Sequence, residues 1–142
     1  MINRKKINAI FLIGLPDNKE LLVNGYNDSG KLVYRWNGNC DFHAQIINKN
    51  IALHKINLIW FEEIAYKIPR SDIIVNCIND ADICLKSLKR AENLIASIKA
   101  RLPKIKVFNP PEFIAQTTRD YIYQNYKNLD GIYIPKTLSL HP

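Results

Sequence analysis

The sequence is poor in glycine, with five residues in a chain of 142, and this scarcity excludes several nucleotide-binding motifs. A dinucleotide site needs the spacing G-x-G-x-x-G between a strand and a helix, so that the backbone can approach the pyrophosphate. Gly14 stands alone after the first apolar run, and neither a P-loop nor a G-x-S-x-G nucleophile elbow occurs. We therefore expect no NAD or FAD binding and no serine nucleophile.

Cysteine and histidine are equally scarce, with three residues of each. Three cysteines cannot all pair and show no disulfide-framework spacing, which fits a reducing compartment. Cys40 and His43 lack the second ligand pair of a zinc site, and Asp80 with Asp82 lacks a third metal ligand. No histidine has neighbours typical of a catalytic base. We expect neither a metal site nor a catalytic residue in this chain.

Long apolar runs are missing as well, since none reaches the roughly 18 to 20 residues that a membrane-spanning helix needs. The basic N-terminus precedes a short apolar stretch around Ile10–Ile13, but no small-residue cleavage site follows it. A buried first strand is therefore favoured over a signal peptide. We expect no membrane partner and a cytoplasmic location.

Positive charge is in excess, because 20 lysines and arginines oppose 13 aspartates and glutamates, for a net charge of +7. Such a balance raises nucleic acid or an acidic protein as a partner. The basic residues are spread along the chain, however, and no RNP motif, zinc-finger spacing or helix-turn-helix occurs. A solvated basic surface is favoured over a nucleic-acid footprint.

The length and the 47% hydrophobic content predict a single domain over residues 1–142. In its first half we expect a buried strand at 7–13 and a β-hairpin, with strands at 20–26 and 31–36. The pattern between 41 and 66 leaves two interpretations open. Phe42, Ile46 and Ile47 suit one face of a helix, and residues 58–64 suit a strand or a short helix.

The second half predicts alternating strands and helices. Ile73–Val75 is a β-branched run between turn residues, typical of a buried parallel strand. A helix is expected from Ala81 to Arg101, with Asn79 or Asp80 as its N-cap. The remaining expected elements are a strand at 105–108, a helix that Pro111 begins and that covers 112–125, and a short strand at 132–134. This alternation predicts an α/β fold, a Rossmann-like three-layer parallel sheet with the N-terminal β-hairpin as an insertion.

Ligands of open α/β sheets gather at the carboxyl ends of the strands. Three loops are expected there, at 14–17, 76–82 and 109–111. The middle loop is polar and leads into a helix N-terminus, whose N–H groups could hold an anion. Helix capping alone is the favoured explanation for Asp80.

Four short motifs follow one another near the C-terminus: Asn109-Pro110-Pro111, Thr118-Arg119-Asp120, Gly131-Ile132 and Pro135-Lys136-Thr137. With the loop 76–82, they resemble the pre-ATP-grasp domain of carboxylate–amine ligases, such as glutathione synthetase and the ribosomal-protein glutamate ligases. They are also similar to uncharacterised bacterial ATP-grasp proteins. Tyr121 departs from the pattern, because the family has a lysine after the acidic residue.

The resemblance implies a domain of the pre-ATP-grasp type that forms the substrate-side wall of an ATP-dependent ligase and does not catalyse alone. The family's phosphate loop, ATP-clamping lysines and Mg²⁺ ligands are not in this chain, so Mg²⁺-ATP is expected only in a full-length parent. The implied partner is an ATP-grasp domain, after residue 142 or in trans, and a homodimer is also considered. The implied substrate-binding residues are Arg119, Asn79, Asp80, Asn109 and Thr118.

Arg119 is the strongest of these candidates, because a guanidinium can grip a carboxylate or phosphate through two hydrogen bonds. A salt bridge to Asp120 or a solvated position on the helix is the alternative, and Asn109 also suits a purely structural turn. Two other functions stay open. The chain could be a basic module that binds nucleic acid or an acidic protein, or a small-molecule sensor or transferase half that uses the loop 76–82 for a nucleotide-sugar.

Overall fold

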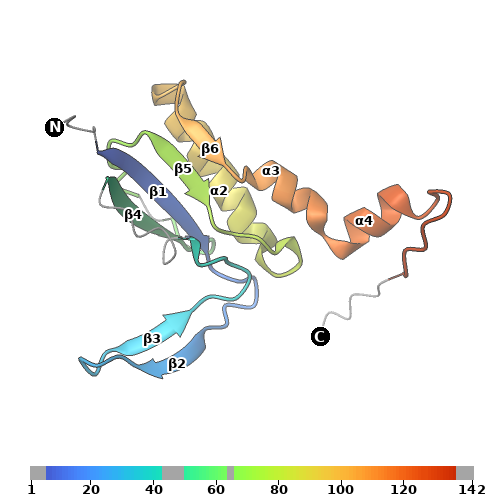
Figure 1. Ribbon diagram of the computed structural model, residues 1–142, viewed down its shortest axis with the longest axis horizontal. Helices are drawn as coiled ribbons and strands as arrows, with labels where there is room; N and C mark the ends of the chain where they lie inside the picture. Colours follow the sequence, from blue (N-terminus) through green and yellow to red (C-terminus); the bar gives the residue numbers. More distant parts are fainter. Residues whose placement is uncertain (1–5, 43–49, 64–65, 137–142) are drawn as a thin grey trace.

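The computed structural model describes residues 6–42, 50–63 and 66–136. Its centre is a sheet of four parallel strands in the order β4-β1-β5-β6 (Figure 1). The strands span Ile7–Gly14 (β1), Ile51–Leu58 (β4), Ile73–Asn76 (β5) and Lys106–Phe108 (β6). The prediction of an α/β fold with a parallel sheet is confirmed.

Strand β1 lies between two neighbours, and this position explains why its sequence is almost continuously apolar. Residues 9 to 14 are all buried, as expected for a parallel strand covered on both faces. Because side chains alternate along a strand, Ile10 and Leu12 point to one face, and Phe11 and Ile13 to the other. The two sets belong to separate hydrophobic clusters on opposite faces of the sheet.

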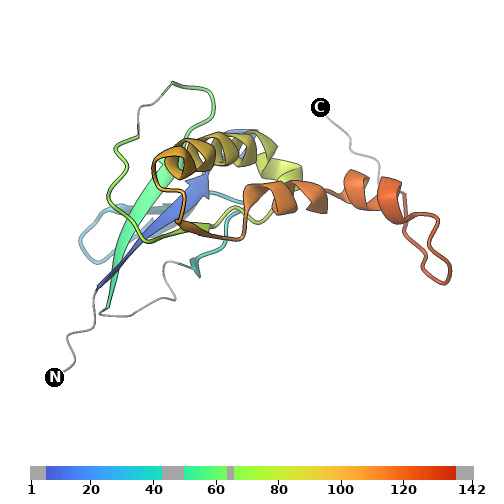
Figure 2. The same cartoon turned by 90° about the horizontal axis from the view of Figure 1, so that it is seen from above.

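Helix α2, Ala81–Arg101, covers the first of these faces (Figure 2). Its bounds agree with the prediction, and Leu102 caps its end immediately before Pro103. Apolar residues three and four positions apart form the buried stripe that packs on β1, β4 and β5. The buried side chains of the helix are Ala81, Cys84, Ser87, Leu88, Ala91, Ile95 and Ile98.

The other face of the sheet carries Ala9, Phe11, Ile13, Val75 and Cys77. Within the described ranges it is covered by Trp36 and Cys40, from the segment that follows the hairpin, and by no helix. The described part of the chain therefore has one helical layer on the sheet.

The hairpin is confirmed as a separate two-stranded antiparallel sheet, with β2 at Leu22–Tyr26 and β3 at Leu32–Arg35. Its turn is held by Asn27, whose Oδ1 accepts hydrogen bonds from the N–H groups of Ser29 and Lys31. This side chain replaces backbone partners in the turn, as asparagine commonly does. The hairpin projects from the main sheet (Figure 1).

The region between 41 and 66 contains a strand that the sequence pattern did not locate. Strand β4 ends at Leu58, so the interpretation of 58–64 as a strand or helix is wrong for 59–63, which are irregular. As an edge strand, β4 alternates buried Ile56 and Leu58 with exposed Lys55 and Asn57, which weakens its apolar signal. Ile46, Ile47 and Ile64 lie outside the described residues.

Two predictions near the C-terminus are wrong. The single helix over 112–125 is instead three pieces: α3 at Pro111–Ile114, a 3₁₀ turn at Ala115–Thr117 and α4 at Arg119–Tyr126. The break lies at Thr118, which is extended (ψ 145°) and caps α4 with its hydroxyl. Residues 132–134 form no strand: Ile132 and Tyr133 are exposed, and no strand among the described residues pairs with them.

None of the described helices combines the length and the apolar character that crossing a membrane would require.

Candidate functional site

The carboxyl ends of β1 and β5 lie side by side at the point where the order of the parallel strands reverses. The chain passes from β1 to β4 on one side, and then to β5 and β6 on the other. Open α/β sheets bind ligands in the crevice outside this switch point. The candidate site is built around it.

The turn Asn37-Gly38-Asn39 occupies the inner part of this crevice. Asn39 pairs with the end of β1 like an additional strand: its Oδ1 accepts the Gly14 N–H at 2.8 Å, and its Nδ2 donates to the Gly14 carbonyl at 2.8 Å. On the other side, Asn39 forms an antiparallel bridge with Ile78, just after β5. One asparagine thus joins the two sides of the switch point.

Two glycines allow the segments around this point to approach each other closely. A Cβ on Gly14 would lie 2.5 Å from Ser87 Cβ of helix α2. A Cβ on Gly38 would lie 2.6 Å from Cys84 Sγ, and Gly38 also has a φ of +76°, which favours glycine. Gly14 therefore permits tight packing between strand β1 and helix α2. It does not belong to a glycine-rich phosphate-binding loop.

Outside the turn lies an open polar pocket of about 450 Å³. Three of the five predicted substrate-binding residues, Asn79, Asp80 and Arg119, line it. The complete lining comes from three separate segments: Asn37, Gly38 and Asn39; Asn79, Asp80, Ala81 and Asp82; Thr117 and Arg119. The structure thus brings together the loop after β5 and the start of α4, which the sequence did not predict to be neighbours.

Carboxylates of the chain itself satisfy N–H groups at the start of α2. Asp80 is the N-cap and its Oδ1 accepts the Asp82 N–H at 3.0 Å, which confirms the capping interpretation. The helix is kinked at Cys84 (φ −130°, ψ 27°), and beyond the kink Asp17 accepts the Lys86 N–H at 3.1 Å. Such internal caps compete with any external anion at this helix end.

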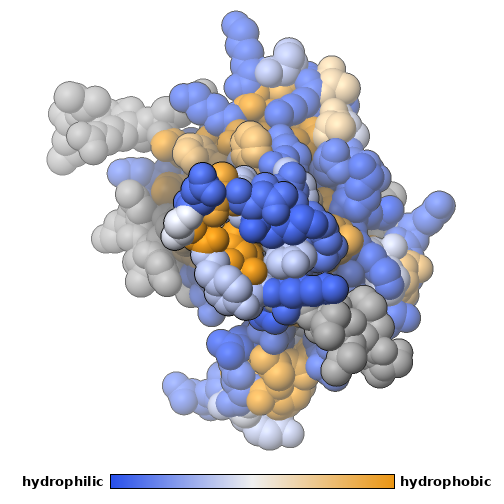
Figure 3. Space-filling model, turned by 90° about the vertical axis from the view of Figure 1, so that its right-hand side faces the viewer, coloured by the Kyte–Doolittle hydropathy of each residue, from blue (hydrophilic) through white to orange (hydrophobic). Residues whose placement is uncertain are grey.

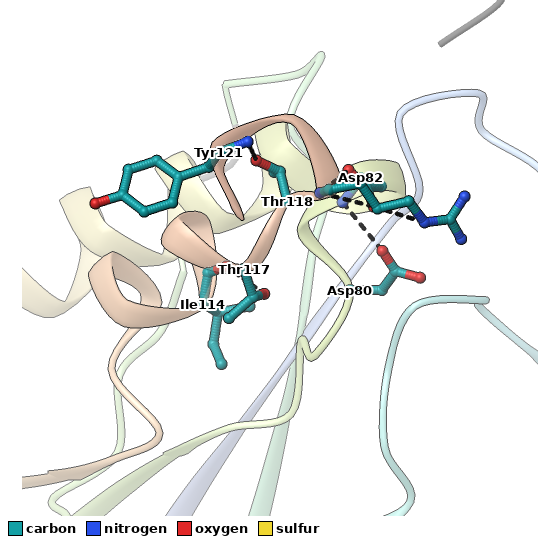
Figure 4. A network of polar contacts seen from close by, with 7 residues as sticks. Asp80, Asp82, Ile114, Thr117, Thr118 and Tyr121 are labelled. Atoms are coloured by element: carbon teal, nitrogen blue, oxygen red, sulfur yellow. Dashed lines mark hydrogen bonds and ion pairs between the residues drawn. The ribbon is translucent and has the colours of Figure 1, made fainter. Parts of the chain in front are cut away.

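Arg119 is held at the pocket by Asp82, which Figure 4 shows near the N-cap residue Asp80. Its backbone N–H donates to Asp82 Oδ1 at 3.2 Å, and its Nε lies 3.5 Å from Asp82 Oδ2. Arg119 does form a salt bridge, as the alternative prediction proposed. Its partner is Asp82, so the prediction of Asp120 as the partner is wrong. The Arg119 side chain is 72% exposed, so the pair is worth less than about 1 kcal/mol.

The terminal Nη atoms of Arg119 make no hydrogen bond or ion pair within the described part of the chain. They are the donors that could bind a carboxylate or phosphate in two places.

Thr118 and Asn109 have structural roles. The Thr118 Oγ1 accepts the Tyr121 N–H at 3.1 Å and so caps α4 (Figure 4). Asn109 has a φ of +54°, and its Nδ2 donates to the Asn76 carbonyl at 3.0 Å, which ties the ends of β5 and β6 together. Neither residue lines the polar pocket.

Asn37, Gly38, Asn39 and Thr117 were not among the residues predicted for the site from the sequence. The run Asn-Gly-Asn directly follows the predicted hairpin strand at 31–36. Its signal was nevertheless present, because Asn and Gly at adjacent positions favour a left-handed turn.

The pocket is suited to recognition more than to covalent chemistry. Amide side chains, two carboxylates and one guanidinium can orient a polar or zwitterionic ligand. In the described ranges, no group of three or more His, Cys, Asp or Glu side chains is placed to hold a metal ion. Burial raises the pKa of Cys84, beside Gly38, to about 12, so this thiol is a poor nucleophile.

No family model matches the chain, and no curated protein or solved structure is significantly similar to it.

Proposed function

We propose that this chain is a Rossmann-like domain of the pre-ATP-grasp type, which forms the substrate-side wall of an ATP-dependent carboxylate–amine ligase. The observation that carries the proposal is the polar pocket at the strand switch point, with Arg119 at its rim. On this proposal the domain binds and orients a substrate and does not catalyse alone.

The strand order supports the proposal. Numbered along the chain, the parallel strands lie in the order 2-1-3-4, which is the order of doubly wound α/β folds with a switch point next to the first strand. A three-layer arrangement would add a helical layer to the face that carries Phe11 and Val75.

The C-terminal arm, residues 119–136, supports the proposal from another direction. Helix α4 buries none of its residues, and Leu129, Ile132 and Tyr133 after it are exposed. Figures 1 and 2 show the arm leading away from the sheet. A short helix that packs on so little of the protein is marginal in water, so a partner surface on the arm is expected.

The chemistry of such a ligase explains the division of labour. An acyl-phosphate intermediate needs Mg²⁺ and cationic groups on the phosphates of ATP, which the catalytic domain would supply. The domain described here would hold the carboxylate or amine substrate in the geometry for attack. Arg119 would grip an anionic group through its Nη atoms, while Asp82 fixes its Nε.

The test is to express the complete reading frame that contains residues 1–142 and to measure ADP release with Mg²⁺-ATP and panels of carboxylates and amines. We expect turnover that requires both substrates, and Arg119→Ala to raise the KM of the anionic substrate while the KM of ATP is unchanged. Arg101→Ala, at the other end of α2, is the matched control. Tight binding of Mg²⁺-ATP to residues 1–142 alone, measured by calorimetry, would contradict the proposal.

A basic binding module remains the second candidate, and one cluster favours it. The Lys86 Nζ lies 4.1 Å from the ring centroid of Trp60, and the Lys19 Nζ lies 4.3 Å from that of Phe61. Aromatic rings beside ammonium groups are common in sites for single-stranded nucleic acid. Retention on a mixed DNA/RNA column at low salt, lost in Lys86→Glu and kept in Lys106→Glu, would support this candidate; no retention would end it.

A further inference from the structure

We propose that Cys40 and Cys77 form a reversible disulfide bond when the protein meets a small-molecule disulfide as oxidant. The bond would join the segment after the β2–β3 hairpin to the residue that follows strand β5. This inference is independent of the proposed ligase function, because it rests on the positions of two thiols and not on the polar pocket.

Cys40 and Cys77 lie directly opposite each other in a short antiparallel ladder. Asn39 forms an antiparallel bridge with Ile78, so the next pair along the ladder is Cys40 and Cys77. The Cys40 N–H donates to the Cys77 carbonyl at 2.8 Å, in agreement with this register. Opposite residues in such a pair have Cα atoms about 4.5 to 5.5 Å apart, and disulfide bonds span Cα separations of about 4.4 to 6.8 Å. The backbone is therefore already at a separation that a disulfide can bridge.

The two side chains also lie on the same side of the sheet. Residues opposite each other in an antiparallel pair share a face. Cys77 belongs to the hydrophobic cluster around Phe11 and Val75, and Cys40 packs against the same cluster. The Cys40 Sγ lies 3.1 Å from the Cys77 carbonyl oxygen, so its sulfur is already beside Cys77. Burial and, to a smaller extent, the neighbouring Cys40 thiol raise the pKa of Cys77 to about 12.

Cys84, the third cysteine, provides a comparison within the same molecule. It is buried as well, and burial raises its pKa to about 12. Its Sγ lies 3.4 Å from the Asn37 carbonyl oxygen, and the residue belongs to the hydrophobic cluster on the opposite face of the sheet. Burial and a high pKa are thus common to Cys77 and Cys84, whereas the position opposite Cys40 is specific to Cys77.

The bond would form by thiol–disulfide exchange in two steps. Cys40 is partly exposed and Cys77 is buried, so the oxidant reaches Cys40 first. Cys40 loses its proton to solvent and attacks one sulfur of the small disulfide, whose S–S bond breaks and releases one small thiolate. Cys77 then loses its proton and attacks the Cys40 sulfur of the mixed disulfide, which releases the second small thiolate. The two cysteines lose two electrons in total, and the small disulfide is reduced to two thiols.

The second step is intramolecular, and this offsets the small fraction of Cys77 that is ionised. Groups held opposite each other react at a high effective concentration. Burial raises the pKa of both thiols, however, so both are weakly ionised at neutral pH. We therefore expect the exchange to take minutes to hours, the range of uncatalysed disulfide reactions.

The bond would fix the base of the hairpin on the sheet. The hairpin carries exposed hydrophobic surface, which is visible at the bottom of Figure 3. The segment that connects it to the sheet packs on the cluster around Phe11 through Trp36 and Cys40. A covalent link across 37 positions restricts mainly the unfolded chain, so the oxidised protein should be the more stable form.

The experiment is to incubate the reduced chain with glutathione disulfide for several hours and to determine its mass and its non-reduced peptide map. We expect each chain to lose the mass of two hydrogen atoms and to yield a peptide that links Cys40 to Cys77. Cys77→Ala should stop at the mixed disulfide, with one glutathione on Cys40. Cys84→Ala is the matched control, because it removes a thiol that is equally buried, and it should still form the bond.

Urea denaturation of the oxidised and the reduced protein gives a second readout. We expect oxidation to raise the midpoint of the wild type and to leave that of Cys40→Ala unchanged. A wild type that stays reduced or stops at the mixed disulfide would overturn the proposal. So would a bond to Cys84 in place of Cys77, or a midpoint that falls on oxidation.

Discussion

Replacement of Gly14 by alanine is expected to separate helix α2 from the central strand. The new Cβ would lie 2.5 Å from Ser87 Cβ and 2.7 Å from Ile78 Cδ1. Carbon atoms in contact normally lie about 3.5 to 4.0 Å apart, so each of these neighbours must move by about 1 Å. Ser87 Cβ is bonded directly to the helix backbone and can move that far only if α2 moves with it.

The magnitude follows from two costs and one gain. Overpacking of a well-filled core costs about 1 to 3 kcal/mol. The Ser87 hydroxyl donates to the Leu15 carbonyl at 2.6 Å in the buried core, and weakening this bond costs about 1 kcal/mol. Alanine in place of glycine in a strand returns roughly 0.5 to 1 kcal/mol of backbone entropy. We expect Gly14→Ala to lower the free energy of unfolding by about 1 to 3.5 kcal/mol.

Urea denaturation followed by circular dichroism measures this change. Gly25→Ala is the control: no atom lies within 4 Å of its Cβ, so only the left-handed backbone (φ +110°) opposes it, at about 1 to 2 kcal/mol. The double variant Gly14→Ala/Ser87→Gly should be more stable than the sum of its single changes predicts, because it removes the closest clash. A Gly14→Ala protein within about 0.5 kcal/mol of wild type would refute the argument.

Three further predictions concern the same region. Asn39→Ala should destabilise the fold by about 2 to 4 kcal/mol in the same urea assay, because two half-buried backbone groups of Gly14 lose their partner; an unchanged midpoint would contradict the role of Asn39. Burial raises the pKa of the Asp17 carboxyl above its ordinary value of 3.8. The contribution of this shift to folding stability is fully present below the pKa of Asp17 in the unfolded chain, and it is lost as the pH rises through the pKa of Asp17 in the folded protein. Asp17→Asn, which retains an acceptor for the helix cap, should therefore gain stability relative to wild type between pH 4 and pH 7, and a loss over that interval would be inconsistent with the shift. Cys77 is buried, which raises its pKa to about 12, whereas the Cys40 thiol is partly exposed to solvent. A disulfide reagent should therefore label Cys40 before Cys77 in the native protein. Equal labelling rates for the two thiols would contradict the burial of Cys77.

Strands β1 and β5 and helix α2 could be predicted because each of them carries its own local signal. The continuous apolar run of β1 reflects a strand that is buried on both faces, and the apolar stripe of α2 reflects a helix that is buried on one face. Both patterns are local in the sequence. The capping role of Asp80 was equally local, since an N-cap contacts only its own helix.

The errors fall where the local signal was weak or ambiguous. Strand β4 lies at the edge of the sheet, and its polar alternate positions resemble those of a loop or a helix. The residues 112–125 have a helical composition, but Thr118 ends one helical segment and caps the next with its side chain. The apolar run 132–134 is similar to a strand, yet a strand forms only where a neighbour supplies hydrogen bonds.

Local sequence patterns were sufficient for the α/β class, the buried strands β1 and β5, and the start and end of helix α2, because hydrophobic periodicity and capping act between residues close in the chain. Tertiary structure alone decided the composition of the pocket. Asn39 reaches Gly14 across 25 positions, and Asp82 holds Arg119 across 37. Such contacts depend on which strands are neighbours and on how closely α2 packs on β1, and no local pattern records either of these.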